Sequence, residues 1–498
     1  MGERLWVSPL LLALCASVAW ADVRLPGVIN SNMVLQQGTA VPIWGVAEAN
    51  EEVAVRFSGQ TKTSKADGSG MWLVRLDPLK ACKAPQVMTV SGRNTIRLEN
   101  VLVGEVWVCS GQSNMEFPLH ETTGGAKEVA AADWPQIRLL HVPRTACLEP
   151  ARDVHARWEP CDHRTAGAFS AVGYFFGRRL HQELGVPIGL IECAWSGSRI
   201  MPWTWPRELT AWPWGKTAFA MRSTDANAPE PTTRQAGSLP LATKEDPGAL
   251  YNGMIAPVMP YAIRGATWYQ GEENNDDGLL YRQKLRALIA GWRKAWNQGD
   301  FPFFYVQLAP FRYVYHKPEN LPQIWEAQLA CLSIPQTGMA VTTDLVEDIR
   351  NIHPPDKSDV GLRLALWALA KTYARRDLVY SGPLYKSMSV EGSSIRVGFH
   401  CVGSGLASRN GRPLSCFEIA GADKEFVAAQ ARIEGETVVV WCKQLPAPVA
   451  VRMGGTDTDR PNLMNKEGLP AAPFRTDELG AAMDALIVSH DTPQKERQ

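Results

Sequence analysis

Small polar residues gather directly after an apolar run in the stretch EVWVCSGQSNMEFP, residues 105–118. Gln112, Ser113 and Asn114 follow a glycine where the apolar run ends. A serine in that setting has two chemical uses. It can be the nucleophile of acyl transfer when a general base lies nearby, or it can cap a helix, since Glu116 follows three residues later. The two uses are compatible, because the positive end of a helix dipole also favours a nucleophile.

Three later segments also place polar groups after apolar runs: WSGS at residues 195–198, QGEEN at 270–274, and DLVEDIRNIHPPDK at 344–357. The last contains His353. A serine, a histidine, carboxylates and glycine or asparagine donors are the groups that acyl transfer needs as nucleophile, base, orienting acid and oxyanion hole. Each group also has a plainer interpretation, because glycine and asparagine form turns and a single histidine is usually a surface residue. The two prolines after His353 fix the local backbone and favour the catalytic interpretation.

The polar segments lie in a region of alternating strand and helix patterns, from about residue 101 to 385. Strand patterns fall at residues 106–111, 186–197, 265–272, 302–310 and 338–345, and helical patterns at 170–185, 279–296, 322–333 and 358–374. For the first helix we expect Ser170 as the cap and Gly185 as the stop. Such alternation implies parallel βαβ units, in which ligands bind beyond the carboxyl ends of the strands. The polar segments are therefore expected to meet at one edge of a sheet.

The regions on either side have the patterns of β structure. Residues 22–100 contain short alternating runs separated by Gly, Asn and Asp turns, which predicts an antiparallel β-sandwich. Strand patterns return from about residue 386, which predicts a C-terminal β domain over 386–490, followed by a disordered tail in the final DTPQKERQ. Residues from about 204 to 249, rich in Pro, Thr, Ala and Trp, are expected to form an inserted loop that acts as a lid, a binding loop or a disordered segment.

The N-terminus predicts export. Arg4, an apolar run and Ala19-Trp20-Ala21 together have the form of a cleaved signal peptide over residues 1–21, so we expect a secreted or periplasmic protein without a membrane segment after cleavage. Lys and Arg together number 51, as do Asp and Glu, which leaves no net charge to attract nucleic acid. At 498 residues the chain predicts two or three domains.

The cysteines indicate neither a definite disulfide pattern nor a metal site. Removal of Cys15 with the signal leaves nine cysteines, an odd number, among which a Cys147–Cys161 disulfide is plausible. The sequence has no C-x-x-C pair and no H-E-x-x-H motif, so no metal is expected.

Four motifs together resemble one known family. GQSNM, WYQGEENN, LYNGMIAP and DLVEDIRNIHPPDK are similar to segments of the sialate O-acetylesterase family of SGNH hydrolases. The similarity extends to the leading β region and to NKEGLPAAPFRTD near the C-terminus, so it covers nearly the whole mature chain. The resemblance implies an α/β protein, with an SGNH (flavodoxin-like) three-layer α/β/α hydrolase domain between N-terminal and C-terminal β domains.

The resemblance also implies roles for individual residues. Ser113 would be the nucleophile and His353 the general base, and the Ser113 amide, the Gly197 amide and the Asn274 side chain would form the oxyanion hole. An acetyl-serine would form and then be hydrolysed, with no cofactor. Many SGNH enzymes have Asp where this chain has Arg350, three residues before the histidine. The orienting acid therefore stays open between two catalytic candidates, Asp348 and Glu272.

Five further residues are candidates for substrate binding. Gln112, Asn114 and Gln270 make the surroundings of Ser113 polar, which disfavours a lipase or thioesterase with an apolar channel. Trp203 belongs to a tryptophan-rich segment that suits either sugar stacking or packing. Arg199 can pair with a substrate carboxylate or form a surface salt bridge.

These observations predict a serine esterase that removes O-acetyl groups from carbohydrates and resembles a sialate 9-O-acetylesterase. One alternative substrate is an acetylated polysaccharide such as xylan or xyloglucan. An alternative of another class is a catalytically idle carbohydrate-binding protein, against which the retention of all the acyl-transfer groups argues.

Overall fold

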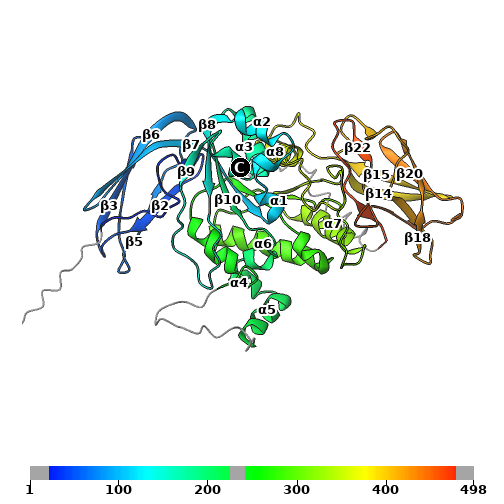
Figure 1. Ribbon diagram of the computed structural model, residues 1–498, viewed down its shortest axis with the longest axis horizontal. Coiled ribbons are helices and arrows are strands. Elements are labelled where there is room, and N and C mark those ends of the chain that lie inside the picture. The colour runs from blue at the N-terminus through cyan, green and yellow to red at the C-terminus, as the bar shows by residue number, and fades with distance from the viewer. Residues whose placement is uncertain (1–21, 225–241, 478–498) are drawn as a thin grey trace, which may run out of the picture.

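The computed structural model describes residues 22–224 and 242–477. The predicted signal peptide, part of the predicted insertion and the predicted tail lie outside the described residues. Figure 1 shows β structure at both ends of the long axis, with helices gathered around a sheet between them.

A mostly parallel sheet forms the centre of the molecule. Its strand order is β13-β12-β11-β7-β10-β8-β9, and only β9 runs antiparallel to its neighbour. The strands are β7 (Thr95–Gly111), β8 (Asp133–His141), β9 (Trp158–Asp162), β10 (Ile188–Ala194), β11 (Gly265–Tyr269), β12 (Phe303–Val306) and β13 (Thr337–Ala340). β10 to β13 are buried along their whole lengths, as parallel strands covered on both faces must be. The expected mixed α/β class and mostly parallel sheet are confirmed, whereas β8 and β9 were not predicted.

The long helices form two contacting pairs. α3 (Ala171–Leu184) contacts α8 (Ser358–Lys371), and α6 (Leu280–Trp296) contacts α7 (Asn320–Ala330). α3 has the predicted ends: the Ser170 hydroxyl accepts a hydrogen bond from the Gly173 amide at 3.0 Å, and Gly185 adopts a left-handed φ of 62°. The other helices of the described residues are α1 (Ser113–Glu116), α2 (Gly125–Ala130), α4 (Pro206–Leu209), α5 (Pro213–Thr224), η1 (Leu119–Glu121), η2 (Ala166–Ala168), η3 (Met201–Trp203), η4 (Tyr251–Ile255), η5 (Ala256–Val258), η6 (Glu272–Asp277) and η7 (Cys331–Ser333).

The N-terminal β region shares a strand with the central sheet. Its strands are β1 (Val34–Gln36), β2 (Val41–Val46), β3 (Glu52–Phe57), β4 (Gln60–Lys65), β5 (Met71–Leu76) and β6 (Cys82–Ser91). β2 pairs with β5, and β3 pairs with β4 and β6, all antiparallel. β6 in turn pairs with the first part of β7, whose second part enters the central sheet. The boundary that we drew at residue 101 therefore lies inside one continuous strand.

The C-terminal β region consists of three small antiparallel sheets. The first has the order β14-β15-β20-β19, the second β18-β17-β21-β23, and the third pairs β16 with β22. The strands are β14 (Leu384–Glu391), β15 (Ser394–His400), β16 (Leu406–Ser408), β17 (Phe417–Ala420), β18 (Phe426–Ala428), β19 (Gln430–Glu434), β20 (Thr437–Trp441), β21 (Ala450–Met453), β22 (Leu463–Asn465) and β23 (Phe474–Arg475).

One expectation from the sequence was wrong, and a second segment is only partly described. The predicted inserted loop, about residues 204–249, contains α4 and α5, and its residues 225–241 lie outside the described residues. The plausible Cys147–Cys161 disulfide is not formed, and both cysteines are free thiols.

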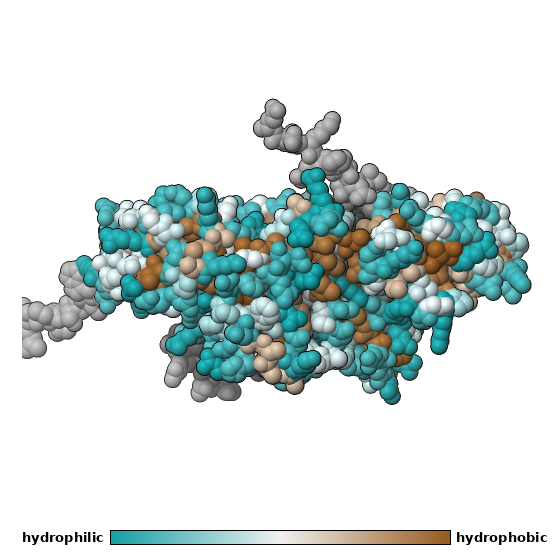
Figure 2. All heavy atoms as spheres, turned by 90° about the horizontal axis from the view of Figure 1, so that it is seen from above, coloured by the Kyte–Doolittle hydropathy of each residue, from teal (hydrophilic) through white to brown (hydrophobic). Residues whose placement is uncertain are grey.

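The described residues contain no helix that is both long and apolar enough to cross a bilayer. The face seen in Figure 2 is mostly hydrophilic, with hydrophobic residues showing between hydrophilic ones along its length. Such a mixture is normal for a folded surface.

Candidate active site

Gly111 lets β7 turn sharply into α1. It lies beside Ala194 of β10 and Tyr269 of β11, so three strands end at the same level. Its φ is 145°, and a side-chain Cβ there would lie 2.1 Å from the Tyr269 carbonyl oxygen, which only glycine avoids. Ser113 is the first residue of α1, whose cap position, Gln112, makes no side-chain capping bond. The interpretation of Ser113 as a helix cap is therefore wrong.

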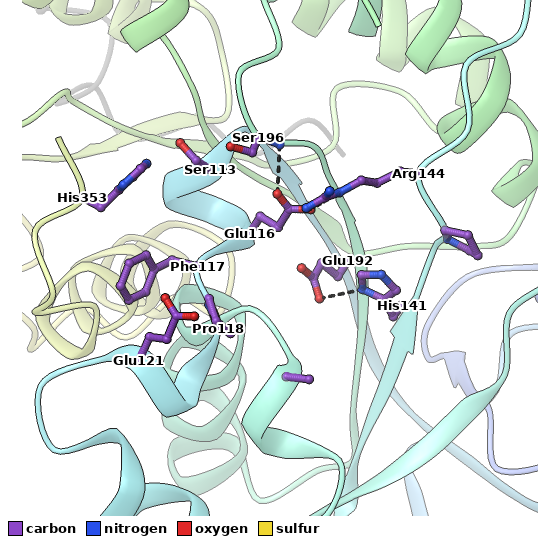
Figure 3. A pocket seen from close by; sticks show the side chains of 12 residues that line it. Ser113, Glu116, Phe117, Pro118, Glu121, His141, Arg144, Glu192, Ser196 and His353 are labelled. Atoms are coloured by element: carbon purple, nitrogen blue, oxygen red, sulfur yellow. Dashed lines mark hydrogen bonds and ion pairs between the residues drawn. The ribbon is translucent and has the colours of Figure 1, made fainter. Parts of the chain in front are cut away.

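An open pocket of about 710 Å³ lies at this edge of the sheet, a size typical of small-molecule sites. Its walls come from α1, η1 and η2, from β8 and β10 with the segments that follow them, and from the loop after β13. The lining residues are Ser113, Glu116, Phe117, Pro118, Glu121, His141, Pro143, Arg144, Ala168, Glu192, Ser196 and His353. Figure 3 shows the Ser113 hydroxyl and the His353 ring turned toward each other across it.

His353 is suited to accept a proton. Its amide donates to the Asn351 side chain at 3.0 Å, and its ring centre lies 6.1 Å from that of Phe117. Burial lowers the pKa of His353, and the nearby Lys357 cation lowers it further. A neutral imidazole at neutral pH is the form that a general base requires.

The two candidate acids occupy different environments. Arg350 donates two hydrogen bonds to Asp348, at 3.0 and 2.9 Å, and lowers the pKa of this half-exposed carboxyl to about 2. Glu272 is buried, which raises its pKa, and it accepts a bond from Asn114 Nδ2 at 2.5 Å. Within residues 22–224 and 242–477, neither carboxylate bonds to the His353 ring.

The predicted oxyanion groups approach the same edge. Gly197, in the turn after β10, has a left-handed φ of 65°, and the neighbouring Ser196 amide donates to Glu116 Oε2 at 2.9 Å. That bond ties the turn to α1. Asn274 is fully buried, and its Oδ1 accepts from the Ile200 amide at 2.9 Å while its Nδ2 donates to Asp277 at 2.5 Å. One of the two Asn274 N–H groups is therefore already used.

The five predicted substrate-binding residues do not line the pocket. Gln112 and Gln270 are buried and bond to each other at 3.1 Å. Trp203 is also buried, with its indole N–H donating to the Ser198 hydroxyl at 2.9 Å. Arg199 pairs with Asp276 at 2.5 Å. These side chains, together with the buried Asn114, support the loops behind the pocket.

Two charge pairs on the pocket wall were not anticipated. Arg144 donates to Glu116 at 2.6 Å, and His141 lies 3.2 Å from the buried carboxylate of Glu192 (Figure 3). The hydrogen bond to Glu192 raises the pKa of His141, and burial raises that of Glu192, so the pair retains a proton more firmly than the free groups would. The signal that could have found this wall is the run QIRLLH, residues 136–141, which ends in a histidine and follows Pro135.

Comparisons with known proteins identify the family to which the chain is similar. A family model described as carbohydrate esterase, sialic acid-specific acetylesterase matches residues 103–370. A sialate O-acetylesterase of Rattus norvegicus is 32% identical over 433 residues, covering 76% of this chain and 79% of the relative. The sialate O-acetylesterase of Homo sapiens is 33% identical over 413 residues, covering 74% and 75%. A solved carbohydrate acetylesterase from Xanthomonas citri is 37% identical with a TM-score of 0.82, covering 92% of this chain and all of that one.

The fold, the serine and histidine at the sheet edge and these similarities define a carboxylic ester hydrolase. The chain belongs to the sialic acid-specific acetylesterase family of carbohydrate esterases. The resemblance noted from four sequence motifs is thereby confirmed.

Proposed function

We propose that the protein is an exported serine esterase that removes O-acetyl groups from sugars through an acetyl-serine intermediate. The observation that carries this proposal is that the Ser113 hydroxyl and the His353 ring, which are far apart in the sequence, face each other in one pocket. Two pairs of helices on the mostly parallel sheet support the SGNH three-layer arrangement as part of the same proposal.

The reaction has two steps. His353 takes the Ser113 proton as the Ser113 oxygen attacks the acetyl carbonyl; the bond from the carbonyl carbon to the sugar oxygen then breaks, and the proton passes to that departing oxygen to form the sugar hydroxyl. Water, activated by the same imidazole, then attacks the acetyl-serine and releases acetate. The first residue of a helix has no intrahelical acceptor for its amide, so the Ser113 amide is free to stabilise the oxyanion together with Gly197. Asn274 could add its second N–H group.

The charges on the pocket wall bear on which acetylated sugar the protein would bind. Similarity to sialate O-acetylesterases favours acetylated sialic acid as the substrate. The wall, however, carries the acidic side chains of Glu116, Glu121 and Glu192 beside the basic side chains of Arg144 and His141. This balance gives no excess of positive charge to bind the sialic acid carboxylate, whereas carboxylates accept hydrogen bonds from sugar hydroxyls. A neutral acetylated polysaccharide such as xylan or xyloglucan is therefore the second candidate.

Acetate release tests the proposal. The mature chain and Ser113→Ala would be assayed with an aryl acetate, O-acetylated sialic acid and acetylated xylan or xyloglucan fragments. We expect release by the wild-type chain and a loss of at least about a thousandfold in the variant, as for other nucleophile removals. Equal release by both proteins would overturn the serine mechanism, and the best substrate would identify the sugar. N-terminal sequencing of protein recovered from the native cell would test export, with Asp22 expected first.

A further inference from the structure

A buried amide connects the two sides of the pocket. Asn114 follows the nucleophile Ser113, and its Nδ2 donates to the carbonyl of Ile352, which precedes His353, at 3.0 Å. The same nitrogen donates to Glu272 Oε1 at 2.5 Å. The Asn114 Oδ1 accepts a hydrogen bond from the Lys357 ammonium. The hydrogen-bonding capacity of this side chain is thus used to hold the histidine loop against the nucleophile helix.

Lys357 is an unusual partner for that amide, because it is fully buried. Its ammonium lies 4.9 Å from the Phe117 ring centre and 5.4 Å from that of Tyr269. Phe117 in turn contacts the His353 ring, so the cation and the imidazole pack against one aromatic side chain. A lysine is almost never buried to this extent without a specific role, since removing its charge from water is costly.

Glu272 supplies the opposite charge on the far side of the amide. Its Oε1 bonds to Asn114, while its buried Oε2 has no hydrogen-bond partner in the part of the chain that the structure describes. Glu272 and Lys357 thus bind opposite ends of the Asn114 amide group. Each of these hydrogen bonds polarises the amide and so strengthens the other.

We propose that Lys357 is a positioning residue of the esterase reaction, which, together with Glu272, acts through the Asn114 amide to hold His353 in place opposite Ser113. This inference rests on the proposed function and gives Glu272 a supporting role in place of direct contact with the histidine.

The electrostatics around Lys357 agree with this role. It is faced by Glu272 from η6, by Tyr269 from β11 and by Asp356 from its own loop. Burial lowers the pKa of Lys357 to about 7, although Glu272 and Asp356 act in the opposite direction. The ammonium is therefore charged throughout the acidic pH range.

The charged groups that act on His353 are Lys357 and Glu121 of η1. Lys357 lowers the pKa of His353 and Glu121 raises it. The charged Lys357 therefore lets His353 stay neutral, and so able to act as a base, down to a lower pH than it would without this cation.

The test separates charge, hydrogen bonding and packing at position 357. Lys357→Arg keeps a cation and a donor, Lys357→Gln keeps a donor alone, and Lys357→Met keeps neither. The matched control is Lys371→Met. Lys371 is the last residue of α8, the helix that begins directly after Lys357, and its ammonium also contacts an aromatic ring, that of Tyr380 at 4.4 Å. Each full-length variant would be measured for kcat/KM on an aryl acetate from pH 4.5 to 9, together with its melting temperature.

We expect the acid limb of kcat/KM to move upward by about 0.5 pH unit or more in Lys357→Met and Lys357→Gln, because His353 loses a neighbouring cation. Lys357→Met should also lose about tenfold or more in plateau kcat/KM, with partial recovery in Lys357→Arg. Lys371→Met should match the wild type. If Lys357→Met loses its fold, the comparison of Gln with Arg still isolates the charge.

An acid limb that stays in place in folded Lys357→Gln, or shifts equally in Lys357→Arg, would overturn the inference. If Ser113→Ala is inactive while the Lys357 variants behave like the wild type, only this inference fails. An inactive wild-type chain would overturn the proposed function as well.

Discussion

The two candidate acids can be distinguished at the level of single residues. Asp348 is half-exposed and already neutralised by Arg350, whereas Glu272 is buried and bonded to the amide that holds the histidine loop. We expect Asp348→Asn to keep kcat/KM within about threefold of the wild type and Glu272→Gln to lose about tenfold or more. Steady-state kinetics on an aryl acetate measure both. The opposite ranking would assign the orienting role to Asp348.

The His141–Glu192 pair predicts a pH-dependent stability. The pKa of His141 is raised above its ordinary value of 6.5, so its stabilising contribution is complete below pH 6.5 and is lost as pH rises through the folded-state pKa. The raised pKa of Glu192 acts in the same direction. Between pH 6 and 8.5 the melting temperature of the wild type should therefore fall by more than that of Glu192→Gln. In free energy of unfolding the difference should be under about 1 kcal/mol, because solvent screens the half-exposed histidine. If the melting temperatures of the two proteins change equally with pH, the His141–Glu192 pair does not make this contribution.

At the scale of elements, the junction of β7 with α1 depends on Gly111. A methyl group there would meet the Tyr269 carbonyl and force a side chain into a left-handed backbone. We expect Gly111→Ala to cost about 2 kcal/mol or more in the free energy of unfolding and to reduce activity, because α1 carries Ser113. The control is Gly68→Ala, in a turn where an added Cβ meets nothing within 4 Å. Thermal melting compares them, and equal stability would show that the junction tolerates a side chain.

The sequence predicted the elements whose signals are local. The cap and stop of α3 and the apolar strands β10 to β13 lie where their own residues placed them. β8 was missed because Pro135 weakens its strand pattern, yet its pairing with β10 outweighs that signal. The convergence of polar segments at one sheet edge could be predicted, because parallel strands align their carboxyl ends. The contact between Asn114 and Lys357 could not, since it joins side chains 243 residues apart.

At the scale of the whole molecule, both β regions are joined to the central α/β region. The N-terminal region shares β7 with the central sheet, and the buried carboxylate of Glu105 on that strand accepts bonds from Arg264 at 2.6 Å and Tyr373 at 3.0 Å. The C-terminal region reaches the loop before His353: Arg409 donates to the Asp344 carbonyl at 3.0 Å. The N-terminal region is therefore continuous with the central sheet through β7, and the C-terminal region contacts the loop that leads to His353.

The contact between the C-terminal β region and the loop before His353 predicts an effect on catalysis from outside the pocket. Arg460 donates to the carbonyls of Val346 and Glu347, at 3.1 and 3.3 Å, in the loop that leads to His353. Arg460→Ala should lower kcat/KM about three- to tenfold, because loss of about 1 kcal/mol of hydrogen bonding leaves the loop less ordered. Its melting temperature should change little, since Arg460 is exposed. The control is Arg432→Ala: Arg432 bonds to Glu434 at 2.6 Å on the same strand, so its loss should leave kcat/KM unchanged. Equal kinetics in the two variants would show that the histidine loop keeps its position without the C-terminal region.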